Sequence, residues 1–215
     1  MTKRFVLVAG NIGSGKTSLT DRLGKRLGWA TAYESVEDNP YLADFYADMH
    51  SWAFHLQVFF LGHRAEQHLA VARSTDSAIV DRSIYEDAEI FARASLELGN
   101  VTERDFKAYR RVYQLVVDSL PAPDLLFYLR APVPVLLERI RARGRPIEAG
   151  ITAEYLTLLD RLYGEWLDGF DLCPVLTIPA DDLDFVKKPR HLRTIIQKVQ
   201  DKLVGKEEVV FGPGE

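Results

Sequence analysis

The sequence predicts an α/β domain in which helices flank both faces of a five-stranded parallel sheet. Short apolar runs alternate with longer stretches of helical periodicity, and this alternation is typical of parallel strands joined by crossover helices. A glycine-rich loop also follows the first apolar run directly, and in such sheets ligands bind at the carboxyl ends of the strands. We therefore expect a doubly wound sheet whose functional residues follow its strands.

The elements can be placed along the chain from the apolar pattern. The expected strands are the runs at residues 5–9, 30–33, 78–80, 125–129 and 175–178. Residues 41–73 have the periodicity of one long helix, and its apolar stripe, expected in the core, consists of Trp52, Leu56, Phe59 and Phe60. A later helix begins near Thr102 and ends before Pro121 and Pro123. Residues 205–215 are expected to form a loosely ordered tail.

Length and composition narrow the class of protein. The 215 residues fit a single domain spanning residues 1–215. No apolar run approaches the ~20 residues that cross a bilayer, which argues against membrane insertion. The net charge of −4 gives no general attraction for nucleic acid. Because Cys173 is the one cysteine and no signal peptide precedes the first strand, we expect a reducing cytoplasm.

The strongest motif is the phosphate-binding pattern G-x-x-x-x-G-K-[ST] after the first strand. Its residues, with the serine that follows, are Gly10, Asn11, Ile12, Gly13, Ser14, Gly15, Lys16, Thr17 and Ser18. The backbone N–H groups of such a loop point at phosphate oxygens, Lys16 adds a positive charge, and Thr17 offers a hydroxyl to Mg²⁺. A chance glycine-rich turn is the alternative, but the strand before and the amphipathic run after the loop disfavour it. The motif predicts a nucleoside triphosphate site for ATP and Mg²⁺.

Charged residues follow the next two strands. Glu34 comes after the second strand, where a carboxylate can take the proton of an acceptor hydroxyl, although solvation or helix capping is an equal alternative. Asp81 and Arg82 follow the third strand. Asp81 can hold Mg²⁺ through water, and Arg82 can reach the transferring phosphoryl group. A salt bridge or a helix cap is the alternative for this pair.

A basic cluster follows the fourth strand and contains Arg139, Arg141, Arg143 and Arg145. Arginine presents a planar donor fork that suits phosphate. In a net acidic protein this cluster favours a mobile lid over the triphosphate, at about residues 139–150, rather than a nucleic-acid surface. A solvated helix end is the alternative.

Taken in order, these motifs make the chain resemble the deoxynucleoside kinases, most of all the bacterial deoxyadenosine/deoxyguanosine kinase branch. The resemblance rests on the phosphate loop, Glu34 followed by Asn39-Pro40-Tyr41-Leu42, Asp81-Arg82-Ser83 with Asp87, and Arg139-x-x-x-Arg143-Gly-Arg145. It implies the P-loop kinase fold with an arginine-rich lid. It also implies that Glu34 is the general base for a sugar 5′-hydroxyl, that Arg82 holds the phosphoryl group, and that Asp81 assists the metal where many relatives have Glu. The candidate magnesium ligands are Thr17, Glu34 and Asp81.

The same resemblance assigns the acceptor side. It places Gln57, Arg64 and Asp87 around the nucleobase, with Phe91 stacking on it; Gln57 and Arg64 share one helix face, and their donors and acceptors suit a base edge. It places Tyr46 and Glu148 at the sugar 3′-hydroxyl, for which an ordinary helix tyrosine and a solvated acid are the alternatives. Ile147 replaces the second acid of many relatives, and Pro146 stiffens the lid. Asp181 and Asp182 would lie near the base of the phosphate donor.

We therefore expect ATP-dependent phosphorylation of the 5′-hydroxyl of a deoxynucleoside, with a purine favoured and deoxycytidine an open alternative. Lys16, Arg82, Arg139, Arg143 and Arg145 would stabilise the phosphoryl group. A thymidylate-kinase-type enzyme is one rival, although Glu34 would repel a monophosphate acceptor. A nucleotide-dependent switch protein is another. Helices near residues 52–69 and 102–117 have enough apolar surface to form a homodimer, as relatives do.

Overall fold

Five parallel strands form the sheet, as the sequence predicted. They are β1 (Phe5–Gly10), β2 (Ala30–Ala32), β3 (Ala78–Asp81), β4 (Leu125–Arg130) and β5 (Val175–Pro179). Their order is β2-β3-β1-β4-β5, so β1 is central, with Val6 opposite both Ile79 and Leu125. The computed structural model describes residues 3–33, 39–181 and 188–203.

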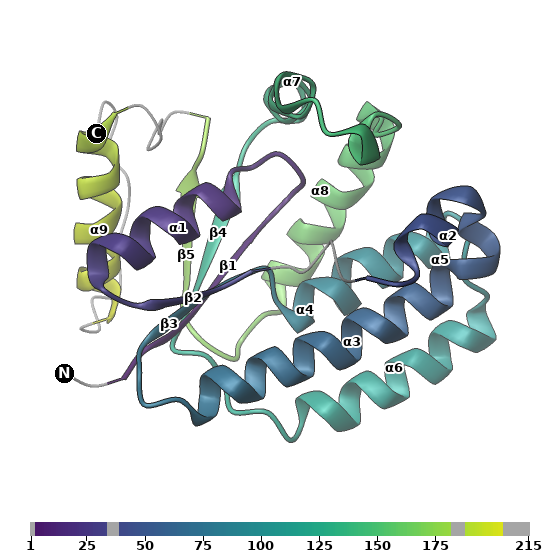
Figure 1. Cartoon of the computed structure of the whole chain (residues 1–215), viewed down its shortest axis with the longest axis horizontal. Coiled ribbons are helices and arrows are strands. Elements are labelled where there is room, and N and C mark those ends of the chain that lie inside the picture. The colour runs from purple at the N-terminus through teal and green to yellow at the C-terminus, as the bar shows by residue number, and fades with distance from the viewer. Residues whose placement is uncertain (1–2, 34–38, 182–187, 204–215) are drawn as a thin grey trace.

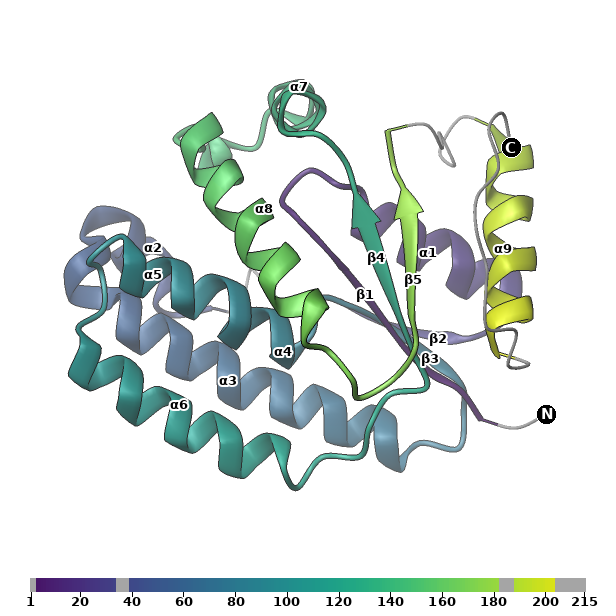
Figure 2. The same cartoon turned by 180° about the vertical axis from the view of Figure 1, so that it is seen from behind.

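Helices cover both faces of the sheet (Figures 1 and 2). Helices α1 and α9 lie on one face, whereas α3, α4 and α8 lie on the other, with α6 outside α3. The helix bounds are α1 (Lys16–Leu27), α2 (Leu42–Ala47), α3 (Met49–Arg73), α4 (Ile84–Glu86), α5 (Arg93–Glu97), α6 (Glu103–Val117), α7 (Val133–Arg143), α8 (Ala153–Asp168) and α9 (Pro189–Leu203). A π-helix, η1 (Asp87–Ala92), and a 3-10 turn, η2 (Pro146–Glu148), complete the described elements.

Each face of the central strand has its own core, because strand side chains alternate between the two faces. Leu7 packs into the cluster formed with α3, α4 and α8, and Val8 packs into the cluster formed with α1, α7 and α9. Every residue of β1 is buried, as expected for a parallel strand covered on both faces. Within the described ranges, no helix is long and apolar enough to cross a membrane.

The long helix predicted for residues 41–73 is two helices, and the prediction of one was wrong. Asp48 separates α2 from α3 with non-helical backbone angles, and its side chain accepts a hydrogen bond from the Ser51 N–H at 3.1 Å. Hydrogen bonding to the Ser51 side chain, and next to the Ser51 N–H, holds the pKa of Asp48 below its usual value. An aspartate N-cap can start a new helix through one such hydrogen bond to a backbone N–H. The break at Asp48 was not visible in the sequence because the apolar pattern is helical on both sides of it.

The aromatic stripe of α3 is only partly in the core. Leu56 is buried, whereas Trp52, Phe59 and Phe60 are half-buried. Tyr41 explains this placement, because its ring lies 5.9 Å from Trp52 and 6.1 Å from Phe59, outside the main clusters. The later helix α6 begins after Thr102, as predicted, and the Thr102 hydroxyl caps it by accepting the Asp105 N–H at 3.2 Å. The tail at 205–215 lies outside the described residues.

Candidate functional site

The phosphate-binding loop joins β1 to α1 at the centre of the sheet. Gly10, Gly13 and Gly15 all have positive φ, at 149°, 83° and 101°. A Cβ at Gly10 would lie 2.7 Å from the Leu129 carbonyl oxygen, and one at Gly13 would lie 2.9 Å from that of Leu136. Because no larger residue fits these approaches, the glycines let the loop lie directly against β4 and α7.

Lys16 points back over this loop. Its Nζ donates to the Gly10 carbonyl oxygen at 2.8 Å and to that of Asn11 at 3.1 Å, and the residue is buried. The buried Ser14 hydroxyl has no hydrogen-bond partner in the described part of the chain. Ile12 is half-buried between the two cores, and Ser18 is exposed at the start of α1. The loop therefore presents one cation and one unused hydroxyl beside its backbone.

Thr17 and Asp81 meet beside the loop, as a magnesium site requires. The Thr17 hydroxyl donates to Asp81 Oδ2 at 2.5 Å, and the buried Asp81 Oδ1 accepts nothing from the described residues. This pair fits Mg²⁺, which prefers oxygen ligands and keeps waters and phosphates around it. No cluster of three or more His, Cys, Asp or Glu side chains suited to a metal occurs in the described ranges. Glu34, the third predicted ligand, lies outside those ranges.

Arg82 is held in an unusual backbone conformation. Its φ is +68°, and no other non-glycine residue in the described ranges has a positive φ. Its N–H donates to the Val8 carbonyl oxygen at 3.0 Å, which holds the turn against β1. The Arg82 guanidinium carbon lies 4.3 Å from the centroid of the Phe91 ring, the ring predicted to stack on the base. A left-handed residue costs roughly 1–3 kcal/mol, and such strain concentrates at functional sites.

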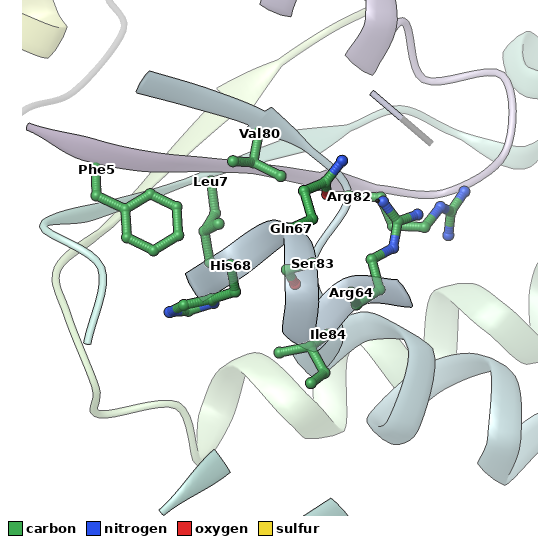
Figure 3. A pocket seen from close by; sticks show the side chains of 9 residues that line it. All are labelled: Phe5, Leu7, Arg64, Gln67, His68, Val80, Arg82, Ser83 and Ile84. Atoms are coloured by element: carbon green, nitrogen blue, oxygen red, sulfur yellow. Dashed lines mark hydrogen bonds between the residues drawn. The ribbon is translucent and has the colours of Figure 1, made fainter. Parts of the chain in front are cut away.

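Arg64 and Asp87, which the resemblance places together around the nucleobase, form a buried ion pair. Arg64 Nε lies 3.0 Å from Asp87 Oδ2, and the two side chains are 1% and 4% exposed. Arg64 Nη1 also donates to the Asp81 carbonyl oxygen at 3.4 Å. A small pocket adjoins the pair, with Arg64 and Arg82 at one end and Phe5 and His68 at the other (Figure 3). The ion pair therefore lies next to the strand end that carries Asp81 and Arg82.

Gln57 lies two turns before Arg64 on α3 and is buried. Its Oε1 is shielded from solvent and has no hydrogen-bond partner within the described ranges. An unsatisfied buried amide is costly, and a ligand with a matching donor would satisfy it. Asp87 and Phe91 both belong to the π-helix η1, whose turns are wider than those of an α-helix. This π-helix was not predicted.

Within the predicted lid, Arg143, which was predicted to bind phosphate, pairs with Glu148, which was predicted to bind the sugar. Arg143 donates to Glu148 with Nη2 2.7 Å from both Oε1 and Oε2, and Nε 3.1 Å from Oε2. Arg145 Nη1 lies 3.7 Å from Glu148 Oε1. Arg139 donates instead to the carbonyl oxygens of Ser14 at 3.4 Å and Ala180 at 2.6 Å. Arg139 thus ties the end of β5 to the phosphate loop, and the other two arginines hold Glu148.

Tyr155 was not predicted as a site residue, but it lies near two residues that were. Burial raises the pKa of its phenol to about 12, and the charge of Arg82 opposes this while Tyr46 adds to it. Tyr155 therefore lies near Arg82 and Tyr46, although Tyr46 itself is 46% exposed on α2. The Thr152 hydroxyl caps the start of α8 by accepting the Tyr155 N–H at 3.2 Å, but a helix cap indicates no binding site.

Three predicted residues remain apart from this geometry. Glu34 and Asp182 lie outside the described residues, and Asp181 is exposed just after β5. The proposed base and the proposed donor loop therefore stay predictions. The structure brings together the phosphate loop, Asp81, Arg82, the Arg64–Asp87 pair and Phe91.

Comparison with known proteins adds evidence about the family. Residues 6–205 match the family model described as deoxynucleoside kinase. The chain is 36% identical over 197 residues to the deoxyadenosine/deoxycytidine kinase of Bacillus subtilis, with 91% of each chain covered. It is 34% identical over 211 residues to the deoxyguanosine kinase of that organism, covering 94% of this chain and 99% of the relative. A solved deoxyadenosine kinase from M. mycoides, with products dCMP and a flexible dCDP bound, has a TM-score of 0.80 and 29% identity, covering 91% of this chain and 98% of its own.

Proposed function

The chain belongs to the deoxynucleoside kinase family, and from this premise we propose that it transfers the γ-phosphoryl group of ATP to the 5′-hydroxyl of a deoxynucleoside. One observation supports the joining of donor and acceptor sites most directly. Arg64 contacts both Asp87, on the base side, and the carbonyl oxygen of Asp81, whose carboxylate meets Thr17 of the phosphate loop. One short chain of contacts therefore links the residues proposed for the two substrates.

Catalysis would rest on positioning and charge. Lys16 lies over the phosphate loop, and Arg82 directly follows β3 with its guanidinium over the Phe91 ring. Both cations would stabilise the charge spread over the transferring phosphoryl group. Mg²⁺, held by Thr17 and Asp81, neutralises phosphate charge when bound. Glu34 would take the proton of the 5′-hydroxyl as general base.

The acceptor is proposed to be a deoxynucleoside whose base carries an amino group next to a ring nitrogen. Asp87 can accept from such an amino group, and Gln57 can pair with the adjacent edge. Adenine, guanine and cytosine all carry an amino group next to a ring nitrogen, whereas thymine has no amino group. We therefore expect deoxyadenosine or deoxyguanosine as the purine substrate, deoxycytidine as a second substrate, and thymidine as a poor one.

We also propose a homodimer and a cytoplasmic location. Val58 of α3 is 45% exposed, and Val112 and Leu115 of the neighbouring α6 are 53% and 68% exposed. An apolar surface on two adjacent helices suits packing across a two-fold axis. Sedimentation of the purified protein tests this, and a Leu115→Lys change should produce monomers. The reducing cytoplasm suits a chain whose one cysteine is Cys173.

Steady-state turnover of Mg·ATP against the four deoxynucleosides and their monophosphates tests the function. Turnover with deoxyadenosine, deoxyguanosine or deoxycytidine supports the proposal. Turnover with monophosphates alone would move the chain to the thymidylate-kinase-type rival, although the relatives compared above are named deoxynucleoside kinases. Nucleotide hydrolysis without any acceptor would favour the switch protein.

A further inference from the structure

Glu86 is a fully buried carboxylate beside the phosphate loop, and the proposed reaction assigns it no role. It is 0% exposed, and its Oε1 accepts the Gly10 N–H at 3.2 Å and the Tyr163 hydroxyl at 2.7 Å. Its Oε2 accepts the Ser83 N–H at 3.0 Å and the Ser83 hydroxyl at 3.2 Å. The carboxylate thus joins β1, the start of α4 and α8 through one residue.

Tyr163 completes the link from α8. Its side chain is fully buried, and its hydroxyl lies 2.8 Å from the Gly10 carbonyl oxygen as well as 2.7 Å from Glu86. Burial, with the charge of Glu86 as the next cause, holds the pKa of this phenol well above its usual value, so the phenol keeps its proton. The phenol proton lies between two acceptors, Glu86 Oε1 and the Gly10 carbonyl oxygen. Glu86 therefore binds the N–H of Gly10, and Tyr163 binds its carbonyl oxygen.

The Gly10 carbonyl oxygen is also where Lys16 is held. Lys16 Nζ lies 2.8 Å from that oxygen, so the phenol and the ammonium bind the same atom from different elements. Helix α8 makes a second contact with the loop, because Asn11 Nδ2 donates to the Leu156 carbonyl oxygen at 3.0 Å. The position of the loop and of its cation therefore depends on α8, the helix that follows the lid.

We propose that Tyr163 and Glu86 act as a pair of positioning residues that set the phosphate loop, and with it Lys16, for binding and transfer of the triphosphate. The inference rests on the proposed kinase function and deepens it. Neither side chain contacts substrate in this scheme. Both act through the backbone of Gly10, and Glu86 also acts through Ser83, which follows Arg82 directly. Oriented backbone groups of this kind contribute to catalysis only when they are held in place.

Tyr163→Phe removes only the hydroxyl from the pair. We expect the affinity for a non-hydrolysable ATP analogue to fall about tenfold, because Glu86 loses a donor and Gly10 loses a contact. We expect kcat to fall in parallel, while KM for the deoxynucleoside stays unchanged. The matched control is Tyr109→Phe, since Tyr109 is a buried phenol on α6 whose hydroxyl has no hydrogen-bond partner in the described part of the chain.

A second variant separates positioning from general stability. Glu86→Gln keeps the size of the side chain but replaces one accepting oxygen with an NH₂ group. That NH₂ group would face donor groups of Gly10, Ser83 or Tyr163, and two donors cannot form a hydrogen bond with each other. If the two residues act as a pair, the double variant should bind the analogue no more weakly than the worse single variant. The melting temperature of each variant shows whether the assay temperature is low enough for that variant to remain folded.

The outcomes are distinct. Wild-type analogue affinity and kcat in a folded Tyr163→Phe protein would overturn the inference, as would equal losses in Tyr109→Phe or strictly additive losses in the double variant. A change confined to KM for the deoxynucleoside would also overturn it. If the wild-type protein turns over no deoxynucleoside, the proposed function fails, and analogue binding still decides the role of the pair.

Discussion

Arg143 and Glu148 bind each other across the turn that ends α7, with three donor–acceptor distances of 3.1 Å or less. We predicted Arg143 for phosphate and Glu148 for the sugar, so each must leave the other before both can bind substrate. The Glu148 side chain is only 11% exposed, against 35% for Arg143, so solvent reaches the arginine more than the glutamate. If residues 139–150 close over ATP as predicted, this ion pair opposes the closure.

Glu148→Gln should weaken this pair and the sugar contact at once. We expect KM for ATP to fall by about threefold, the range of a partly exposed ion pair, because Arg143 is released. KM for the deoxynucleoside should rise, since a carboxylate acceptor is lost. Steady-state kinetics with each substrate varied separately measures both. Glu138→Gln, an exposed change on α7, is the control and should alter neither constant.

Asp87→Asn should leave the Arg64 charge buried without its carboxylate. Breaking a buried pair on one side costs about 3–5 kcal/mol, so the free energy of unfolding in urea should fall by that order. Preference for deoxyadenosine over thymidine should also decline. The double change Arg64→Met with Asp87→Leu should recover much of the stability but none of the preference. Full stability in Asp87→Asn would contradict the assigned geometry.

Thr17→Val should raise the Mg²⁺ concentration needed for half-maximal turnover. The hydroxyl that now donates to Asp81 at 2.5 Å would be missing, and a methyl group cannot bind the cation. Thr17→Ser keeps the hydroxyl and serves as the control, with near-normal magnesium dependence. A magnesium titration of initial rates distinguishes the two, and identical curves would remove Thr17 from the metal site.

Glu34→Gln should lower kcat by about a hundredfold or more, since general-base catalysis contributes roughly that factor. Deoxynucleoside binding should persist because the amide keeps the size of the carboxylate. Single-turnover rates and equilibrium binding measure the two effects separately. Near-normal turnover would exclude Glu34 as the base, whereas lost binding would make it a substrate ligand.

The stability of the protein should fall in mild acid because of His68. Burial lowers the pKa of this histidine, although its hydrogen bond to the Pro121 carbonyl oxygen, at 2.7 Å, opposes the shift. As the pH falls, His68 therefore takes up a proton in the unfolded chain before it does so in the folded protein. The stability that neutral His68 contributes is present above about pH 6.5 and is lost as the pH falls toward the lowered pKa of the folded state. His68→Gln keeps a donor for Pro121, and its melting temperature should depend less on pH between 7.5 and 5.5, to an extent of roughly one titrating group.

Local signals in the sequence were sufficient for the strands and the phosphate loop. The apolar run before Gly10 indicates the first strand, and the spacing of the glycines indicates the phosphate loop. Both features depend only on residues that are neighbours in the chain. The family resemblance grouped Arg64 with Asp87 around the base, and the structure pairs them directly. The break at Asp48 was not predicted, because an N-cap within continuous periodicity changes few residues.

Contacts between distant segments explain what was missed. Tyr163 and Glu86 are 77 residues apart, and nothing local to either indicates the other. The π-helix at residues 87–92 is invisible to periodicity, because one wide turn shifts the pattern by less than a residue. The Arg143–Glu148 pair was within reach of the sequence, but both residues had been assigned to substrate.

The position of β1 at the centre of the sheet also matters while the protein is being synthesised. β1 is synthesised before the other strands, but its two partner strands begin only at residues 78 and 125. Both of its edges therefore lack hydrogen-bond partners until those strands have been made. An apolar strand with unpaired edges is prone to aggregate or to bind chaperones. Translation pauses before residue 125 would therefore prolong the most vulnerable period of this protein, and the glycine-rich loop would acquire its final shape only after β4 has emerged.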